Sequence, residues 1–318
     1  MRALASVAAV VLASACVTHG PNIPSPLVHA PSDPGGPAPT TDAVTAFAID
    51  AFDFGEESSD GYASLGLDID GQATASGTPH CQTIDESTPG SEPASGIDNA
   101  FGRSLWPLIV TFLAPEATSQ ANASFATGGR VNLLVAQGLT GKATVSPVVL
   151  SMQQGLPLGA QPRWDGTDRW PVDGNAPALA FSRSYVVQES LVGEPPSGGG
   201  QLVLGLIGSA SDPDAGAGFG PLELVIPVTH VQIVAPLAAD GSITNGVLSG
   251  IIPVSGALAL GGQFAAATRG SVFSADSYQM QVNAAADILV DGTQDPSRTC
   301  DGISLGLGFT ARPVKTSP

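Results

Sequence analysis

Four oxygen-bearing side chains in the first third of the chain have the spacing expected of a calcium site. Asp68 and Asp70 stand two residues apart, and Asp98 and Asn99 follow in the next turn-rich stretch. On a strand, Asp68 and Asp70 point to the same face. Calcium takes about six to eight oxygen ligands, which carboxylates and amides near a turn can supply. Calcium is therefore the candidate cofactor, although no complete calcium-loop motif is present and turn residues that bond nearby backbone would look the same.

A second acidic group surrounds Cys300 near the other end of the chain. Its members are Asp287, Asp291, Asp295 and Asp301. Carboxylates this close repel one another unless a cation or hydrogen bonds intervene, so the group adds support to the calcium prediction. Turn chemistry at Asp291-Gly292 and Asp295-Pro296 explains most of the pattern without a metal.

The string from Trp164 to Trp170 is the most distinctive short segment. Two indoles flank Asp165 and Asp168. Trp offers a flat apolar face and carboxylates accept hydrogen bonds from hydroxyls, so the string could bind a sugar. The structural alternative, which we prefer, is a loop that both indoles anchor on the body while Asp165 and Gly166 form a turn.

Most catalytic motifs are absent. The sequence has no His-Glu-x-x-His zinc motif and no Gly-x-x-x-x-Gly-Lys phosphate loop. A serine triad is not expected, because only His80 and His230 lie in the part expected to fold. A glycosidase needs only two carboxylates at a suitable separation, so a polysaccharide hydrolase stays open as the alternative function.

Composition narrows the class of protein further. Lys and Arg number 11 and Asp and Glu 28, which gives a formal net charge of −17. Such a surface repels phosphate backbones, so nucleic acid is not expected as a partner. Many Gly and Pro residues, few aromatics and few charges indicate turn-rich β structure.

Alternating apolar residues predict the strands that must position these groups. Residues 61–70 read as a half-buried strand, 105–113 as an interior strand that is apolar on both faces, and 303–310 as a last alternating strand. Cys81 and Cys300 lie near the first and last of these strands. We therefore expect a disulfide between Cys81 and Cys300.

The remaining pattern predicts a mainly β fold. A phase change at Asp50 and Ala51 indicates a bulge in the first strand, and helical spacing from Asp276 to Gly292 predicts a small helix before the last strand. Short strands bounded by Gly, Pro, Asp or Asn favour a two-sheet β-sandwich, of jelly-roll or concanavalin-like type, as a single domain over residues 44–318. The other expected strands are 44–54, 130–137, 143–152, 179–187, 201–207, 222–234 and 242–254.

The N-terminus predicts export. Arg2 and the apolar residues up to Ala15 read as a signal peptide over residues 1–15, and the small residues before Cys16 resemble the lipobox of bacterial lipoproteins. The resemblance implies a diacylated Cys16 and a lipid anchor in the cell envelope, with the outer membrane as the expected membrane. An ordinary signal peptidase site, giving a secreted or periplasmic protein, is the alternative. Residues 16–43 are rich in Pro and read as a tether.

Several motifs together resemble a group of secreted and lipoprotein-type proteins of myxobacteria and their relatives. The group has no assigned activity, so the resemblance supplies no catalytic residue. Its members often carry a Tyr-Asn-Gly-like stretch ahead of the Trp string, where this chain has residues 138–141. The motifs that carry the resemblance are 67–71 with Cys81, 96–102, 162–170 and 300–311.

These observations predict a lipid-anchored envelope protein that is not an enzyme. It would act as a surface binding or structural module, with an extracellular glycan or an envelope protein as partner. The carboxylate-dependent polysaccharide hydrolase is the alternative.

Overall fold

A computed structural model gives the fold, and it describes ten stretches of the chain. The predicted signal peptide and Cys16 lie outside them. The described residues are 29–36, 38–56, 60–72, 80–84, 96–113, 116–141, 143–196, 202–211, 218–268 and 275–317.

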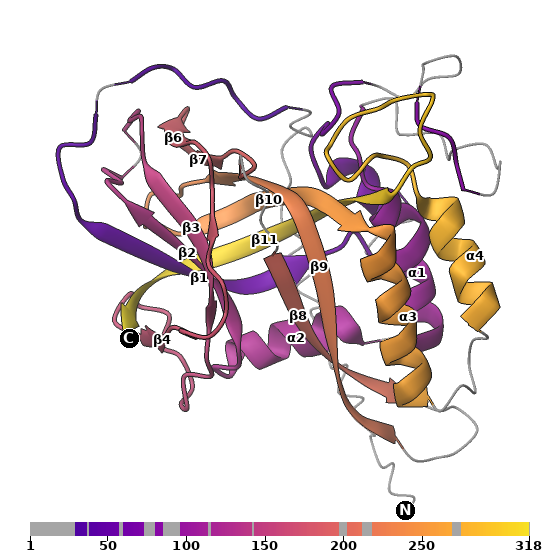
Figure 1. Cartoon of the computed structure of the whole chain (residues 1–318). Coiled ribbons are helices and arrows are strands. Elements are labelled where there is room, and N and C mark those ends of the chain that lie inside the picture. The colour runs from indigo at the N-terminus through magenta and orange to yellow at the C-terminus, as the bar shows by residue number, and fades with distance from the viewer. Residues whose placement is uncertain are drawn as a thin grey trace, which may run out of the picture.

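Strands are the commonest regular structure in the described chain, and they form one mainly antiparallel sheet (Figure 1). Its order is β5-β3-β2-β1-β11-β10-β9-β7-β6, with β4 beside β11 and β8 beside β9. The strands are β1 (Val44–Asp53), β2 (Val131–Gln137), β3 (Val149–Gly155), β4 (Arg169–Pro171), β5 (Leu179–Ala180), β6 (Ser184–Val187), β7 (Ser190–Gly193), β8 (Leu202–Ser211), β9 (Gly218–Pro236), β10 (Ile243–Pro253) and β11 (Gly302–Ser317).

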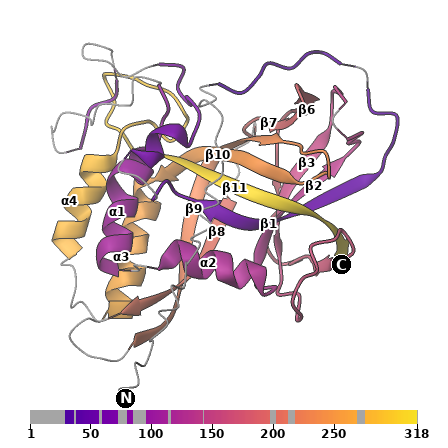
Figure 2. The same ribbon diagram turned by 180° about the vertical axis from the view of Figure 1, so that it is seen from behind.

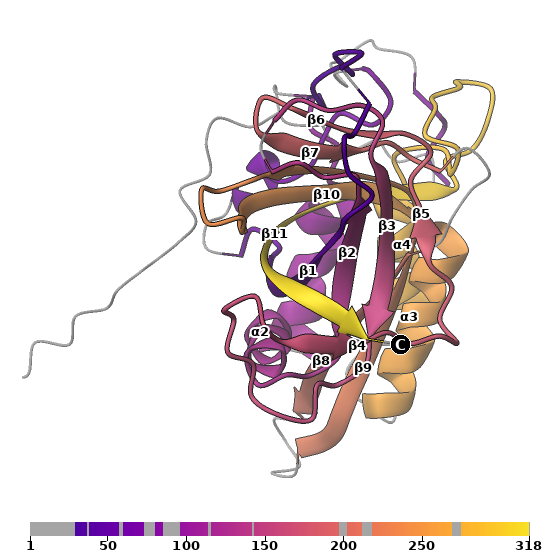
Figure 3. The same cartoon turned by 90° about the vertical axis from the view of Figure 1, so that its left-hand side faces the viewer.

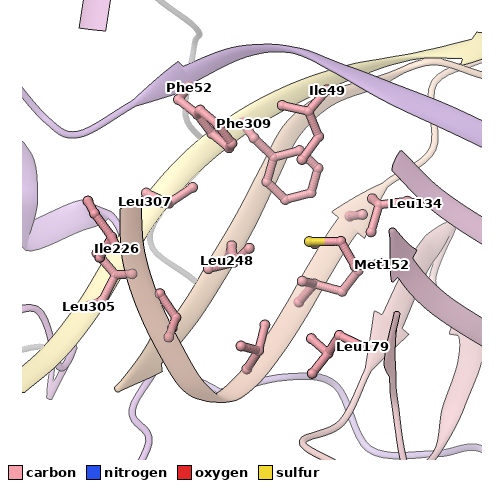
Figure 4. Packing of buried hydrophobic residues seen from close by; sticks show 14 of the residues in the cluster. Ile49, Phe52, Leu134, Met152, Leu179, Ile226, Leu248, Leu305, Leu307 and Phe309 are labelled. Carbon is pink, nitrogen blue, oxygen red and sulfur yellow. The ribbon is translucent and has the colours of Figure 1, made fainter. Parts of the chain in front are cut away.

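The sheet curls until its two ends meet. Val145, just before β3, pairs with Val186 of β6, and each donates its backbone N–H to the other's carbonyl at 3.2 and 2.9 Å. Apolar side chains fill the concave side; Ile49, Leu248 and Phe309 are among those drawn in Figure 4. The mainly β class is thus confirmed. The two separate sheets of a sandwich are not, because one hydrogen-bonded path joins the strands.

α1, α3 and α4 gather beside one end of the sheet, while α2 lies apart from them against β1 and β8 (Figures 1 and 3). α4, which leads towards the last strand, confirms the predicted helix, whereas α2 and α3 were not predicted. The helices of the described chain are η1 (Gly61–Ser64), η2 (Phe101–Leu105), α1 (Trp106–Leu108), η3 (Ile109–Leu113), α2 (Ala117–Ala126), α3 (Val254–Thr268) and α4 (Ala275–Ala285).

The predicted strand over 105–113 is wrong, because the segment is helical from η2 to η3. A run that is apolar on all sides fits a buried helix as well as a buried strand. Pro107 lies inside this helical segment, directly after the π-helical turn η2, and it removes one backbone donor from the helix there. Trp106 and Ile109 are buried in the core.

The predicted strand over 61–70 is also wrong. After η1 the chain is irregular and crosses β11 without pairing along it, so that Leu65 and Leu67 are buried in a loop. Gly66 has a φ of +129°, which breaks an extended run. The alternating pattern predicted the burial of Leu65 and Leu67 correctly, but these residues pair with no neighbouring strand.

Other details of the strand prediction hold. β1 and β11 slip register between Ile49 and Ala51, which confirms the bulge. Figure 2 shows β1, β11 and β10 running side by side across the body. Within β9, pairing with β10 ends at Thr229 and pairing with β8 begins at Val228, one residue from Pro227.

The N-terminal strap, defined as residues 29–36 and 38–43, was expected to be tether but lies against the body. Tyr185 donates a 2.6 Å hydrogen bond from its hydroxyl to the carbonyl of Pro31, and Arg183 lies 3.7 Å from Asp33. Ala43 accepts a bond from the N–H of Gly138, which follows β2. The strap therefore spans the seam where β6 meets the segment before β3.

Candidate functional site

Three predicted metal ligands come together in the structure. Oxygen atoms of Asp68, Asp70 and Asp98 all lie within 4.8 Å of one another. Asp98 is 1% exposed, and the other two are partly buried. The crossing loop, which meets β11 at Gly306, and the turn before η2 position this acidic trio.

Backbone hydrogen bonds hold each carboxylate of the trio. Asp98 Oδ2 accepts bonds from the N–H groups of Ile69 at 2.6 Å and Asp70 at 3.3 Å. Asp68 Oδ1 accepts the N–H of Gly71 at 2.6 Å, so it also closes a turn. The turn reading of these residues therefore has direct support, independent of any metal.

The side chain of Asn99, the fourth predicted ligand, is fully hydrogen-bonded to the backbone. Its Nδ2 donates to the carbonyls of Tyr62, Leu65 and Gly306, and its Oδ1 accepts the N–H groups of Gly102 and Gly306. The side chain is 3% exposed. Asn99 thus anchors the loop and has no amide oxygen to spare for a cation.

Asp70 connects the trio to the disulfide. Cys81 and Cys300 are bonded, which confirms the predicted pair. Gln294 accepts the N–H of Cys81 at 2.9 Å and donates 2.7 Å to Asp70 Oδ2. Burial raises the pKa of Asp70, the bonds from Gln294 and Gln72 oppose that shift, and the neighbouring Asp68 raises it further.

The trio fits part of a calcium shell. Three carboxylates are hard oxygen ligands of the right kind, but calcium needs about six to eight oxygens. Asp68 Oδ2 lies 3.6 Å from His29 Nδ1, and Asp70 Oδ2 already accepts Gln294. Water would have to complete the shell, so calcium at the trio stays a prediction.

The second acidic group does not join the trio; its members lie apart and serve as backbone and side-chain acceptors. Asp287 accepts the N–H of Ser304 at 2.8 Å and its hydroxyl at 2.6 Å. Asp291 pairs with Arg298 at 3.1 Å. Through Gln294, which also donates to the Asp287 carbonyl, the two groups are linked without sharing a site.

The segment Gly302–Gly306 has the Gly-x-Ser-x-Gly spacing of a serine nucleophile, which sequence reasoning passed over. That motif needs an exposed serine on a strand-to-helix turn. Ser304 instead lies within β11, is 0% exposed, donates to Asp287 and accepts the N–H of Ala100 at 2.8 Å. A serine that is fully buried within a strand and already bonded on both sides lacks the exposed position that a nucleophile needs.

The Trp string folds as a tight loop. Trp164 and Trp170 stack with ring centres 5.5 Å apart, and Trp170 is 0% exposed. Asp168 accepts the N–H groups of Arg163 and Trp164, and Asp165 accepts the N–H and hydroxyl of Thr167. A sugar could therefore meet the partly exposed Trp164 but not both indoles.

A groove of about 720 Å³ among the described residues is large enough for a ligand. It lies between the end of β1, the first turns of α2, the start of β10 and the middle of β11. Ligand pockets commonly have volumes of about 300–1,000 Å³. Sequence reasoning missed it, because its residues come from four elements far apart in the chain and share no motif.

Charged groups at the groove are largely held by their neighbours. Arg312 donates from Nε to Asp50 Oδ2 at 2.8 Å. Glu56 Oε1 accepts the indole N–H of Trp106 and the hydroxyl of Thr118, and Asp53 Oδ1 accepts the N–H of Gly55 at 2.8 Å. The second oxygen of Glu56 and of Asp53 has no hydrogen-bond partner among the described residues.

Comparison of the chain with protein-family models, curated proteins and solved structures found no match. The myxobacterial resemblance therefore stays a prediction. Among the described residues, none of the helices has the length and apolar character needed to cross a bilayer.

Proposed function

We propose that this chain is an exported, lipid-anchored envelope protein whose folded body is a non-enzymatic surface-binding module. The observation that carries the proposal is the groove between β1, α2, β10 and β11, which has the size of a ligand site. Export and lipidation at Cys16 are supported by the sequence pattern alone. The outer membrane is the proposed location.

The distribution of carboxylates favours binding over catalysis. A general acid or base needs a carboxyl group within reach of its substrate. Asp98, Asp168 and Asp287 are instead used to hold backbone N–H groups. These acids stabilise loops, so the sequence's many carboxylates do not indicate an active site.

A polysaccharide hydrolase is the second candidate, because two carboxylates line the groove. Asp53 and Glu56 each have one oxygen fixed by a donor and one without a described partner. Glycosidases use two such groups on either side of the scissile bond. This pair, and not Asp68 and Asp70, is the one a hydrolase would use.

Ligand screening with a groove-blocking variant tests the binding function. Thr244 is exposed at the groove mouth, so Thr244→Trp fills the groove without entering the core; Thr244→Ser, which keeps the hydroxyl, is the matched control. Thermal-shift screening of oligosaccharides, peptides and envelope extracts should give ligands that stabilise the wild type and Thr244→Ser but not Thr244→Trp. The absence of any such ligand overturns the binding function.

Turnover separates the two candidates. A ligand that survives incubation intact supports the binding module. Release of new reducing ends, lost in Glu56→Gln, establishes the hydrolase instead.

The proposed lipid anchor and location are tested independently of the groove. Metabolic labelling with a radioactive fatty acid should mark the full-length protein, and Cys16→Ser should abolish the label and release the protein from membranes. An unlabelled wild type points to the secreted or periplasmic alternative.

A further inference from the structure

We infer that the groove binds a neutral, hydroxyl-rich ligand, a saccharide, through the start of β10 and the two groove carboxylates. The inference rests on the proposed binding function and names its ligand class. Thr244, Asn245, Asp53 and Glu56 all line the groove. They come from opposite walls, so a ligand between them would meet polar groups on both sides.

Hydrogen-bonding capacity is available on the β10 wall. Thr244 is exposed and Asn245 is partly buried. Neither side chain has a hydrogen-bond partner among the described residues. A hydroxyl and an amide both donate and accept, which matches the double character of sugar hydroxyls.

The opposite wall supplies acceptors. Glu56 is held by Trp106 and Thr118, and Asp53 is held by Gly55, each through one oxygen. The second oxygen of each carboxylate can accept a hydroxyl proton. Such charge-assisted bonds are stronger than neutral ones, and fixed side chains lose little entropy when they bind.

The balance of charge excludes anionic ligands. Among the described residues that line the groove, Arg312 is the one that carries a positive charge. Its Nε lies 2.8 Å from Asp50 Oδ2, so Asp50 neutralises it. Asp53 and Glu56 then leave the groove net negative, as is the whole chain at −17. Uronic acids, sulfated sugars and phosphates would be repelled.

The floor of the groove combines two glycines with an aromatic ring. Gly246 and Gly308 lie on neighbouring strands, and the Phe309 ring packs against Gly246. A Cβ at Gly246 would come within 2.4 Å of the Phe309 ring, so packing also requires this glycine. Glycine in a strand commonly marks a place where another group approaches closely.

Three sets of oligosaccharides of matched length test the inference by calorimetry: neutral, anionic and amine-bearing. Neutral members should bind with an affinity that is insensitive to salt. Asn245→Ala and Thr244→Ala should each weaken binding by about twofold to tenfold, as expected for one lost hydrogen bond. Glu56→Gln keeps the shape and one carbonyl acceptor, and should weaken binding in the same range. Trp164→Ala, away from the groove, is the control and should leave binding unchanged.

The possible outcomes distinguish a failure of the saccharide inference from a failure of the proposed binding function. Preferential binding of the anionic or amine-bearing set, or of a peptide, with loss in Thr244→Trp, overturns the saccharide inference and keeps the binding module. Neutral saccharide binding lost in Trp164→Ala but kept in Thr244→Trp places the site at the Trp string and overturns the groove. No ligand from any set overturns both. Circular dichroism and melting temperature of each variant exclude misfolding as the cause.

Discussion

The side chain of Asn99 pairs with Gly306 as a neighbouring strand would. Its Oδ1 accepts the Gly306 N–H at 2.9 Å, and its Nδ2 donates to the Gly306 carbonyl at 2.9 Å. A Cβ at Gly306 would lie 2.2 Å from the carbonyl oxygen of Leu65, so only glycine allows the loop to come this close. One amide thereby joins the crossing loop, the turn before η2 and the central strand β11.

Replacing this amide should be strongly destabilising. Asn99→Ala leaves buried backbone groups of Leu65, Gly102 and Gly306 without partners, and each such group costs about 1–3 kcal/mol. We expect a loss of at least about 3 kcal/mol in the free energy of unfolding, measured by denaturant titration. Asn99→Asp keeps both accepted bonds but places a carboxylate oxygen against the carbonyls that Asn99 Nδ2 faces, so it should also be strongly destabilising. Equal stability of wild type and Asn99→Ala would contradict this role.

Part of this arrangement could be predicted from the sequence. The motifs around Asp68, Asp98 and Cys300 were expected to approach one another because of the disulfide, and they do. The sequence left both a metal and backbone hydrogen bonding open for these groups, and in the structure Asn99 and Asp287 bond backbone. Sequence shows which polar groups are close to a turn, but it does not show which N–H groups they face.

The disulfide should contribute a large share of stability. Cys81 and Cys300 are separated by 219 residues, and a cross-link over such a loop restricts the unfolded chain by about 5 kcal/mol in the chain-entropy estimate. The Cys81→Ser, Cys300→Ser double variant should therefore unfold at much lower denaturant concentration. Adding reductant to the wild type should have a similar effect, and the double variant should not respond to it. A wild type insensitive to reductant after full denaturation and refolding would refute this estimate.

The N-terminal strap should stabilise the seam of the curled sheet. Deleting residues 1–43 removes the partners of Tyr185, Ser146 and Gly138, while deleting residues 1–28 keeps them. We expect the longer deletion to cost about 2–4 kcal/mol in unfolding free energy and the shorter one little. Similar stability of both truncated chains would show that the strap is only tether.

Tyr185 reports on the same seam through its ionisation. Burial first, then the neighbouring Glu194, raise the pKa of Tyr185 to about 12 from its ordinary value near 10. The pairing with Pro31 is therefore present below about pH 10 and is lost as the pH rises towards 12. Ultraviolet titration, with Tyr185→Phe subtracted, should show this high pKa in the wild type and a lower one after deletion of residues 1–43. An unchanged titration would mean that the strap does not cover the phenol.

The curl of the sheet and the groove could not be predicted in the same way. Most strand positions followed from alternation, but the contact between Val145 and Val186 joins segments whose residues carry no pairing signal. The helical segment around Trp106 was apolar on every side, and such a run does not distinguish helix from strand. The residues of the groove come from β1, α2, β10 and β11, so they became recognisable as a set only in the folded chain.

The acidic trio should make stability depend on pH. The folded pKa of Asp70 lies above its ordinary value of 3.8, chiefly because of burial. The neutral form is thus favoured in the fold, so the stabilisation is present below about pH 4 and is lost as the pH rises through the raised pKa. Asp70→Asn removes the charge and keeps an acceptor for Gln294. Relative to wild type, it should gain stability near neutral pH, and the difference should shrink on acidification.

Calcium bound by the trio would cancel the repulsion between Asp70 and the neighbouring Asp68. Millimolar calcium should therefore raise the melting temperature of the wild type, and EDTA should lower it, with no response in Asp70→Asn. A wild type indifferent to both additions would remove the metal and leave the trio as a set of turn-forming carboxylates.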